Sequence, residues 1–182
     1  MFTLTIHMVS SLDGFVAKHD NSVEWFETPD HFEQGLDPKA AFADYATVDC
    51  YVMGARTYEH AFELSKKHGW PYGDTPTIVL THRELPSNRR SVEFYTGDLV
   101  KLVQEQLQPR FKSVWVVGGP DITKAFLRAG LADELRQNIL PILLGDGVPF
   151  YNQVGREQAL HLLEVKTYTS GLVELRYALR GA

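Results

Sequence analysis

The fold is decided by the stretch Val114-Trp115-Val116-Val117-Gly118-Gly119-Pro120-Asp121. Its four apolar residues predict a buried strand, which the diglycine ends. Proline suits the first turn of a helix, so we expect a helix from Asp121 to Ala129, closed by Gly130. A strand that passes through glycines straight into a helix is the unit from which parallel α/β sheets are built.

The same pattern recurs earlier in the chain. The apolar run Cys50–Met53 stops at Gly54, and a helix is predicted over Arg56–Leu64. Thr77–Leu80 is a further predicted strand. The other predicted elements are strands at 3–9, 15–17 and 92–95, a helix over 31–45 that Pro38 breaks or restarts, a helix from Asp98 to Gln108, a strand over 134–144 that Pro141 demotes in part to an edge or bulge, and a hairpin of 160–168 and 172–179.

These elements predict an α/β fold. Repeated strand–helix units imply a mostly parallel central sheet with helices on both faces, and the terminal hairpin adds antiparallel strands. The length of 182 residues suits one domain, and no linker or repeat divides the chain. We therefore expect a single domain over residues 1–182.

Composition excludes several classes of function. The single cysteine, Cys50, rules out an intrachain disulfide and a cysteine-built metal site, and the scattered histidines offer no pair at helical ligand spacing, so we expect no metal. The net charge of −5 argues against a nucleic-acid surface. With neither a signal peptide nor a long apolar run, the sequence predicts a cytoplasmic protein without membrane segments.

The diglycine is also the first candidate binding site. Glycines allow a ligand to approach the backbone closely, and a helix N-terminus offers free N–H groups and the positive end of the helix dipole. A pyrophosphate would suit this junction. A tight strand–helix turn without a ligand explains the same residues, because the full GxGxxG fingerprint is missing.

Two other junctions place hydroxyl and basic side chains at strand ends. They are Gly54-Ala55-Arg56-Thr57 and Leu80-Thr81-His82-Arg83. Each alone is explained by a solvated arginine at a turn. Three such ends in one parallel sheet favour a ligand site, because open α/β sheets bind ligands beyond the carboxyl ends of their strands.

Asp13, in the sequence Ser11-Leu12-Asp13-Gly14, is the carboxylate nearest the end of the first strand. It could bind or protonate a substrate, or simply form an Asp-Gly turn. Trp25 could stack on a flat heterocycle or pack in the core. The acidic residues Glu33, Asp37 and Asp44 suit a solvated helix face, or one of them could instead face a cleft.

Five segments together resemble the dihydrofolate reductase-like superfamily. Within it, the chain is most similar to the branch built like the C-terminal reductase domain of the bifunctional riboflavin-biosynthesis deaminase–reductase. The resemblance runs from about Leu4 to Leu179. The segments that carry it are Ser11–Gly14, Gly54–Thr57, Gly118–Pro120, Gly130–Leu135 and Pro141–Phe150.

The resemblance implies a three-layer α/β/α fold, a homodimer, and an NADPH-dependent reductase that delivers hydride to a small pterin- or pyrimidine-like heterocycle. A module that binds NADPH without turnover is the alternative. For the cofactor, it implies Gly118, Gly119, Pro120, Asp121 and Ile122 at the pyrophosphate, Gly54, Arg56, Thr57, Thr81 and His82 on the adenosine side, and Ala17 beside the nicotinamide. Ser11 and Asp13 would face the substrate, with Asp13 as the catalytic group and Trp25 as a stacking partner.

The chain also departs from the family pattern. Ala55 holds the usual arginine position, and His82 precedes Arg83, so both basic groups come one residue late. Phe15 replaces the lysine usual in riboflavin reductases, and the deaminase half is missing. We therefore do not expect the phosphoribosylaminopyrimidine of that pathway as substrate. For the homodimer, we expect the apolar run from Ile139 to Leu144 to lie near a sheet edge.

Overall fold

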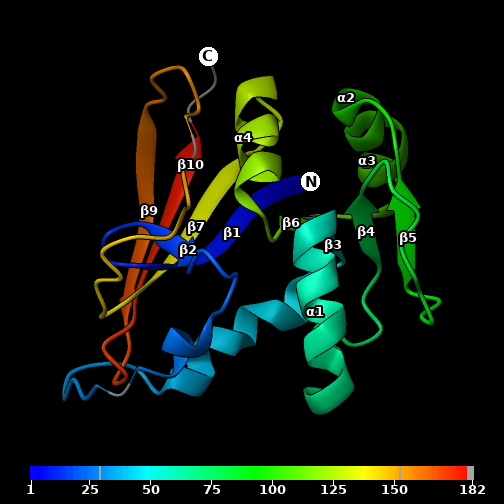
Figure 1. Cartoon of the computed structure of the whole chain (residues 1–182). Coiled ribbons are helices and arrows are strands. Elements are labelled where there is room, and N and C mark those ends of the chain that lie inside the picture. The colour runs from blue at the N-terminus through cyan, green and yellow to red at the C-terminus, as the bar shows by residue number, and fades with distance from the viewer. Residues whose placement is uncertain (29, 152, 180–182) are drawn as a thin grey trace.

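A computed structural model describes residues 1–28, 30–151 and 153–179 (Figure 1). The strands are β1 (Thr3–Ser11), β2 (Phe15–Ala17), β3 (Cys50–Gly54), β4 (Thr77–Leu80), β5 (Val92–Tyr95), β6 (Ser113–Val116), β7 (Glu134–Leu140), β8 (Val148–Pro149), β9 (Leu160–Thr167) and β10 (Val173–Leu179). The helices are η1 (Glu24–Glu27), η2 (Pro38–Thr47), α1 (Ala55–His68), α2 (Leu99–Lys101), η3 (Leu102–Leu107), α3 (Gln108–Arg110) and α4 (Pro120–Ala129).

Eight of the strands form one sheet in the order β5-β4-β3-β6-β1-β7-β10-β9. The pairs from β5 to β7 are parallel, and β10 pairs antiparallel with both β7 and β9. β2 and β8 form a separate antiparallel ribbon. The expected mostly parallel sheet with an antiparallel C-terminal hairpin is therefore confirmed.

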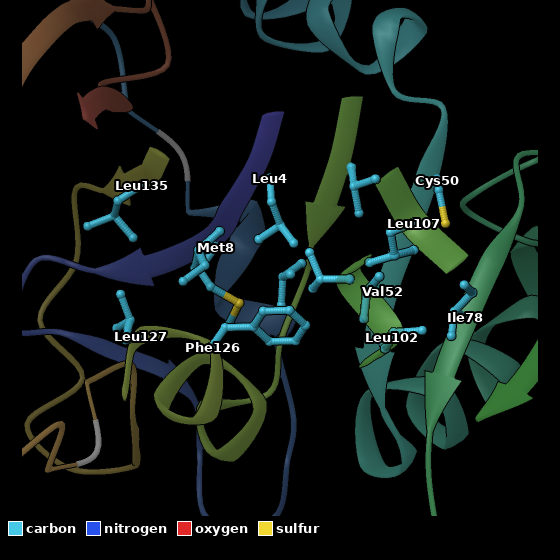
Figure 2. Packing of buried hydrophobic residues seen from close by; sticks show 14 of the residues in the cluster. Leu4, Met8, Cys50, Val52, Ile78, Leu102, Leu107, Phe126, Leu127 and Leu135 are labelled. Atoms are coloured by element: carbon cyan, nitrogen blue, oxygen red, sulfur yellow. The ribbon is translucent and has the colours of Figure 1, made fainter. Parts of the chain in front are cut away.

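Alternation along the strands divides the core between the two faces of the sheet. Leu4, Ile6 and Met8 of β1 pack on one face, with Phe126 of α4 and Leu102 of η3 (Figure 2). The opposite face carries a second cluster, whose members include Tyr51, Met53, Tyr58 of α1, Trp70 and Trp115. The sheet thus lies between two helical layers, as expected for a three-layer fold.

One predicted helix, over 31–45, is wrong in its first part. The segment 31–37 is irregular, and η2 is a 3-10 helix that begins at Pro38. Proline lacks the N–H needed inside a helix, and the Asp37 carboxylate caps the new start by accepting from Lys39 N at 2.8 Å. A short 3-10 helix therefore begins at Pro38.

The strand predicted over 134–144 is also too long. β7 ends at Leu140, and it lies inside the sheet between β1 and β10. The run from Ile139 to Leu144 is therefore not near a sheet edge; the edge strands are β5 and β9. α1, in contrast, continues past Leu64 to His68, with Lys66, Lys67 and His68 at the end of the helix where cations are favoured.

Candidate functional site

The ends of β3 and β6 meet at the diglycine, and Met8 of β1 lies against it. Gly54 N donates to Gly118 O at 2.9 Å, and the peptide bond between Gly118 and Gly119 is cis. Gly118 has φ +103°, and a Cβ there would lie 2.8 Å from Met8 Sδ. A Cβ on Gly54 would lie 2.8 Å from Ile122 Cγ1. The sequence needs glycine at both positions for close packing of the chain itself.

Gly119 differs from these two glycines. Its φ of −79° and ψ of −165° suit any residue, and a Cβ there would meet only Thr57 Oγ1, at 3.5 Å. Gly119 is the N-cap of α4 and Gly54 that of α1, and neither helix has a side chain that caps its N-terminus. Two helix N-termini with their positive dipole ends are thus left available for an anion beside an open backbone surface.

Arg56 and Thr57 lie in the first turn of α1. The Arg56 side chain is exposed and makes no hydrogen bond or ion pair with the residues that the structure describes. A free guanidinium at the start of a helix can bind phosphate oxygens in pairs. The predicted grouping of Gly54, Arg56 and Thr57 with the diglycine is present in the fold.

A cavity of about 510 Å³ lies beyond the ends of β4 and β5. Its lining consists of Thr81, His82, Arg83, Glu84, Leu85, Phe94, Tyr95 and Thr96. His82 Nδ1 and Thr96 Oγ1 are hydrogen-bonded at 2.7 Å, and Thr81 Oγ1 accepts from Arg83 N at 2.9 Å. The volume falls within the range of small-molecule sites in proteins.

Just after β1, Asp13 accepts hydrogen bonds from its own turn, at Ser11, and from the loop at 144–145. Its Oδ1 accepts from Ser11 Oγ at 2.6 Å and from Leu144 N at 3.1 Å, and its Oδ2 accepts from Gly145 N at 2.7 Å. The Ser11 hydroxyl, then the N–H groups of Gly145 and Leu144, lower the pKa of this carboxyl. Asp13 is therefore ionised at neutral pH and acts as a hydrogen-bond acceptor.

Ala17 and Trp25 follow in the same region. Ala17 is buried in β2, and a Cβ on Gly147 would lie 2.4 Å from Ala17 O, so the 141–149 loop lies against this strand. Trp25 is buried in η1, edge-on to Phe26 with the ring centroids 4.6 Å apart. Its Nε1 is buried without a hydrogen-bond partner.

A cluster of charged residues that the sequence patterns do not predict lies on the sheet face beneath η2. Arg136 Nη2 donates to Glu174 Oε2 at 2.7 Å and to Asp44 Oδ2 at 2.5 Å, and Arg136 and Glu174 are 5% and 1% exposed. His7 lies nearby, its ring centroid 4.6 Å from that of Trp115, and burial followed by the charge of Arg136 lowers the pKa of His7 to about 3.

This cluster leaves three buried polar atoms without partners, namely Arg136 Nε, Asn138 Oδ1 and Tyr168 Oη. The available signal was the pair of opposite charges, Arg136 and Glu174, within two predicted strands of the sheet. Asp44 holds η2 onto this face, so it does not belong to a solvated helix face.

Neither a membrane span nor a metal site is found in the part of the chain that the structure describes. None of its helices is long and apolar enough to cross a membrane. No group of three His, Cys, Asp or Glu residues among the described side chains is placed to hold a metal ion.

Comparison with known proteins finds one matching family model, and three similar proteins are described with it. The model of the RibD C-terminal domain matches residues 2–174. The uncharacterized protein YwjB of Bacillus subtilis is 29% identical over 173 residues, which cover 94% of this chain and 95% of that protein. A Shewanella crystal structure named for riboflavin biosynthesis has a TM-score of 0.82 at 25% identity, covering 98% of this chain and 99% of that one.

The third relative is the dihydrofolate reductase of Enterococcus faecalis, solved in complex with NADP(H). It has a TM-score of 0.60 at 16% identity and covers 98% of this chain and 96% of that one. At that identity the likeness concerns the fold, and it confirms the expected dihydrofolate reductase-like architecture.

Proposed function

Because the chain belongs to the family of RibD C-terminal domains, we propose that it is a reductase that uses NADPH to deliver hydride to a small pterin- or pyrimidine-like heterocycle. The observation that carries the proposal is the order of the strand ends. β5 and β4 border the cavity, β3 and β6 border the diglycine, and β1 ends at Ser11. A dinucleotide across these ends would find a nucleoside-sized space, then two helix N-termini, then the substrate side.

The residues present suit this cofactor. The open surface over Gly119 and the uncapped starts of α1 and α4 would accept a diphosphate, with Arg56 supplying a positive charge. The residues proposed to hold the cofactor are Gly118, Gly119, Pro120, Asp121 and Ile122 at the diphosphate, Gly54, Arg56, Thr57, Thr81 and His82 toward the adenosine, and Ala17 at the nicotinamide.

The chain's own task would be binding and orientation. The bound nicotinamide would supply the hydride. The protein would have to orient the cofactor and the substrate and exclude water, and no nucleophilic side chain is required. Asp13 is the proposed substrate anchor. Because its pKa is lowered, it would accept hydrogen bonds from heterocycle N–H groups and would not donate a proton. Ser11 and Trp25 would complete the substrate side.

The direct test is a titration with NADPH followed by steady-state oxidation of NADPH with pterin and pyrimidine acceptors. A module without turnover would bind the cofactor and leave it reduced with every acceptor. We expect weak turnover with dihydrofolate, because no acidic side chain of η2 except Asp44 approaches the sheet, and Asp44 is paired with Arg136. Dihydrofolate turnover with kcat/KM in the usual enzyme range, roughly 10⁴–10⁸ M⁻¹s⁻¹, would contradict this view of the substrate side.

We also propose a homodimer, built on β9. The edge strand exposes four apolar side chains, Leu160, Leu162, Leu163 and Val165, at 39–51%. Such an edge favours association with another strand, and a second copy of this chain supplies a matching one. Light scattering should give about twice the chain mass of 20.6 kDa. Leu162→Lys should shift the protein to monomer; a wild-type mass near one chain would exclude the dimer.

A further inference from the structure

Among the described residues that line the cavity beyond β4 and β5, one is an arginine, Arg83, and a carboxylate from outside the lining holds it. Arg83 Nη2 donates to Glu59 Oε2 at 2.8 Å. Glu59 lies in the second turn of α1, one turn after Arg56 and Thr57. The pair is partly exposed, with 56% of the Arg83 side chain and 43% of the Glu59 side chain accessible, so a ligand group that contacts Arg83 from the cavity also comes near the Glu59 carboxylate.

The other groups of the cavity have the character of a nucleoside site. Leu85, Phe94 and Tyr95 give it an apolar wall, and Thr81 and Thr96 give it hydroxyls. The lining carries one further charged group, the carboxylate of Glu84, while His82 Nδ1 is already bonded to Thr96 Oγ1. Among the described lining residues Arg83 is the one lysine or arginine, and its charge is already paired with Glu59.

We infer that Glu59 is a specificity-determining residue that weakens the binding of a phosphate on the adenosine ribose, so that the chain binds NADH and NADPH with similar affinity. The inference rests on the proposed function, since it needs the adenosine in this cavity. A ribose phosphate that approaches Arg83 also approaches the Glu59 carboxylate. The repulsion from Glu59 offsets the attraction of the guanidinium.

The test compares two fragments of the cofactor by calorimetry at low salt. Adenosine 5′-monophosphate lacks the ribose phosphate, and adenosine 2′,5′-bisphosphate carries it. The wild-type protein should bind the two within about fivefold of each other. Glu59→Gln should tighten the bisphosphate roughly tenfold, the effect of removing one charge about 6 Å from a dianion in a water-like dielectric, and should leave the monophosphate within about twofold.

Two controls sharpen the comparison. Glu63→Gln removes the next acidic residue of the same helix, which is paired with Lys66 at 2.6 Å, and should change neither affinity. Adding Arg83→Ala to Glu59→Gln should remove the gain for the bisphosphate, because the lost attraction of the guanidinium then offsets the lost repulsion of the carboxylate.

The outcomes separate this inference from the proposed function. If both fragments bind and Glu59→Gln changes neither affinity, Glu59 does not set specificity, and the cofactor site remains. If the wild type already prefers the bisphosphate by a hundredfold, the inference is likewise overturned. If neither fragment binds wild type or variant, the cofactor site itself is wrong, and the role of Glu59 falls with it.

Discussion

Replacing Gly119 by alanine should weaken NADPH binding without unfolding the protein. The backbone at Gly119 is extended, with φ −79° and ψ −165°, and the new Cβ would meet only Thr57 Oγ1, at the ordinary contact distance of 3.5 Å. The protein therefore has room for the methyl group. A diphosphate held against the same backbone has no such room.

The size of the effect follows from the contacts that would be lost. Hydrogen bonds to charged groups contribute about 1.5–3 kcal/mol each, so the loss of one corresponds to a roughly tenfold to hundredfold weaker affinity. Calorimetry with NADPH measures the affinity, and thermal unfolding shows that the variant is folded.

The matched control is Gly130→Ala, at the opposite end of the same helix. Gly130 has φ +65°, so alanine there is strained and should lower the unfolding temperature. Its affinity for NADPH should stay at the wild-type value. Equal NADPH affinity of wild type and a folded Gly119→Ala variant would refute the placement of the diphosphate at this junction.

Three further outcomes are expected. Asp13→Asn should lower kcat for the substrate and leave the affinity for NADPH nearly unchanged in calorimetry. If kcat and NADPH affinity both fell, Asp13 would not act on the substrate side alone. Arg136→Met should destabilise the fold by about 3 kcal/mol in urea unfolding, because the buried Glu174 then keeps only Lys166, whose Nζ lies 3.7 Å from its Oε1, whereas adding Glu174→Leu should recover most of the loss. His7 has a folded pKa of about 3, below its unfolded value of about 6.5, so the unfolded state binds its proton first and stability should fall by about 2 kcal/mol from pH 6.5 to 5; His7→Gln should flatten this pH dependence, and an unchanged slope would assign it to other groups.

The strand–glycine–helix junctions were predictable because their signals are local. The apolar run, the diglycine and Pro120 act within eight residues, and the structure has β6 and α4 where the sequence predicts them. The predicted restart at Pro38 is present, because proline suits the first turn of a helix and the Asp37 side chain caps it. The loose apolar stripe before it, over 31–37, does not form a helix.

The parts that could not be predicted depend on residues far apart in the sequence. Asp13 is fixed by Gly145, Arg136 by Glu174 and Arg83 by Glu59. Alternation in β1 marks Thr5 and His7 as a polar face, yet both are buried, because η2 and the ion pairs beneath it cover them. Sequence patterns give the type of each residue but not these distant partners.

The position of β1 has a consequence for how the chain is made. β1 is synthesised before the other strands of its sheet, yet its two neighbours are β6 and β7, at residues 113–116 and 134–140. During synthesis, β1 therefore cannot pair with either neighbour until more than a hundred further residues have emerged. A ribosome stalled before β7 is complete would present an N-terminal strand with apolar side chains and open edges. We expect such a nascent chain to aggregate more readily than the finished protein and to depend more on chaperones.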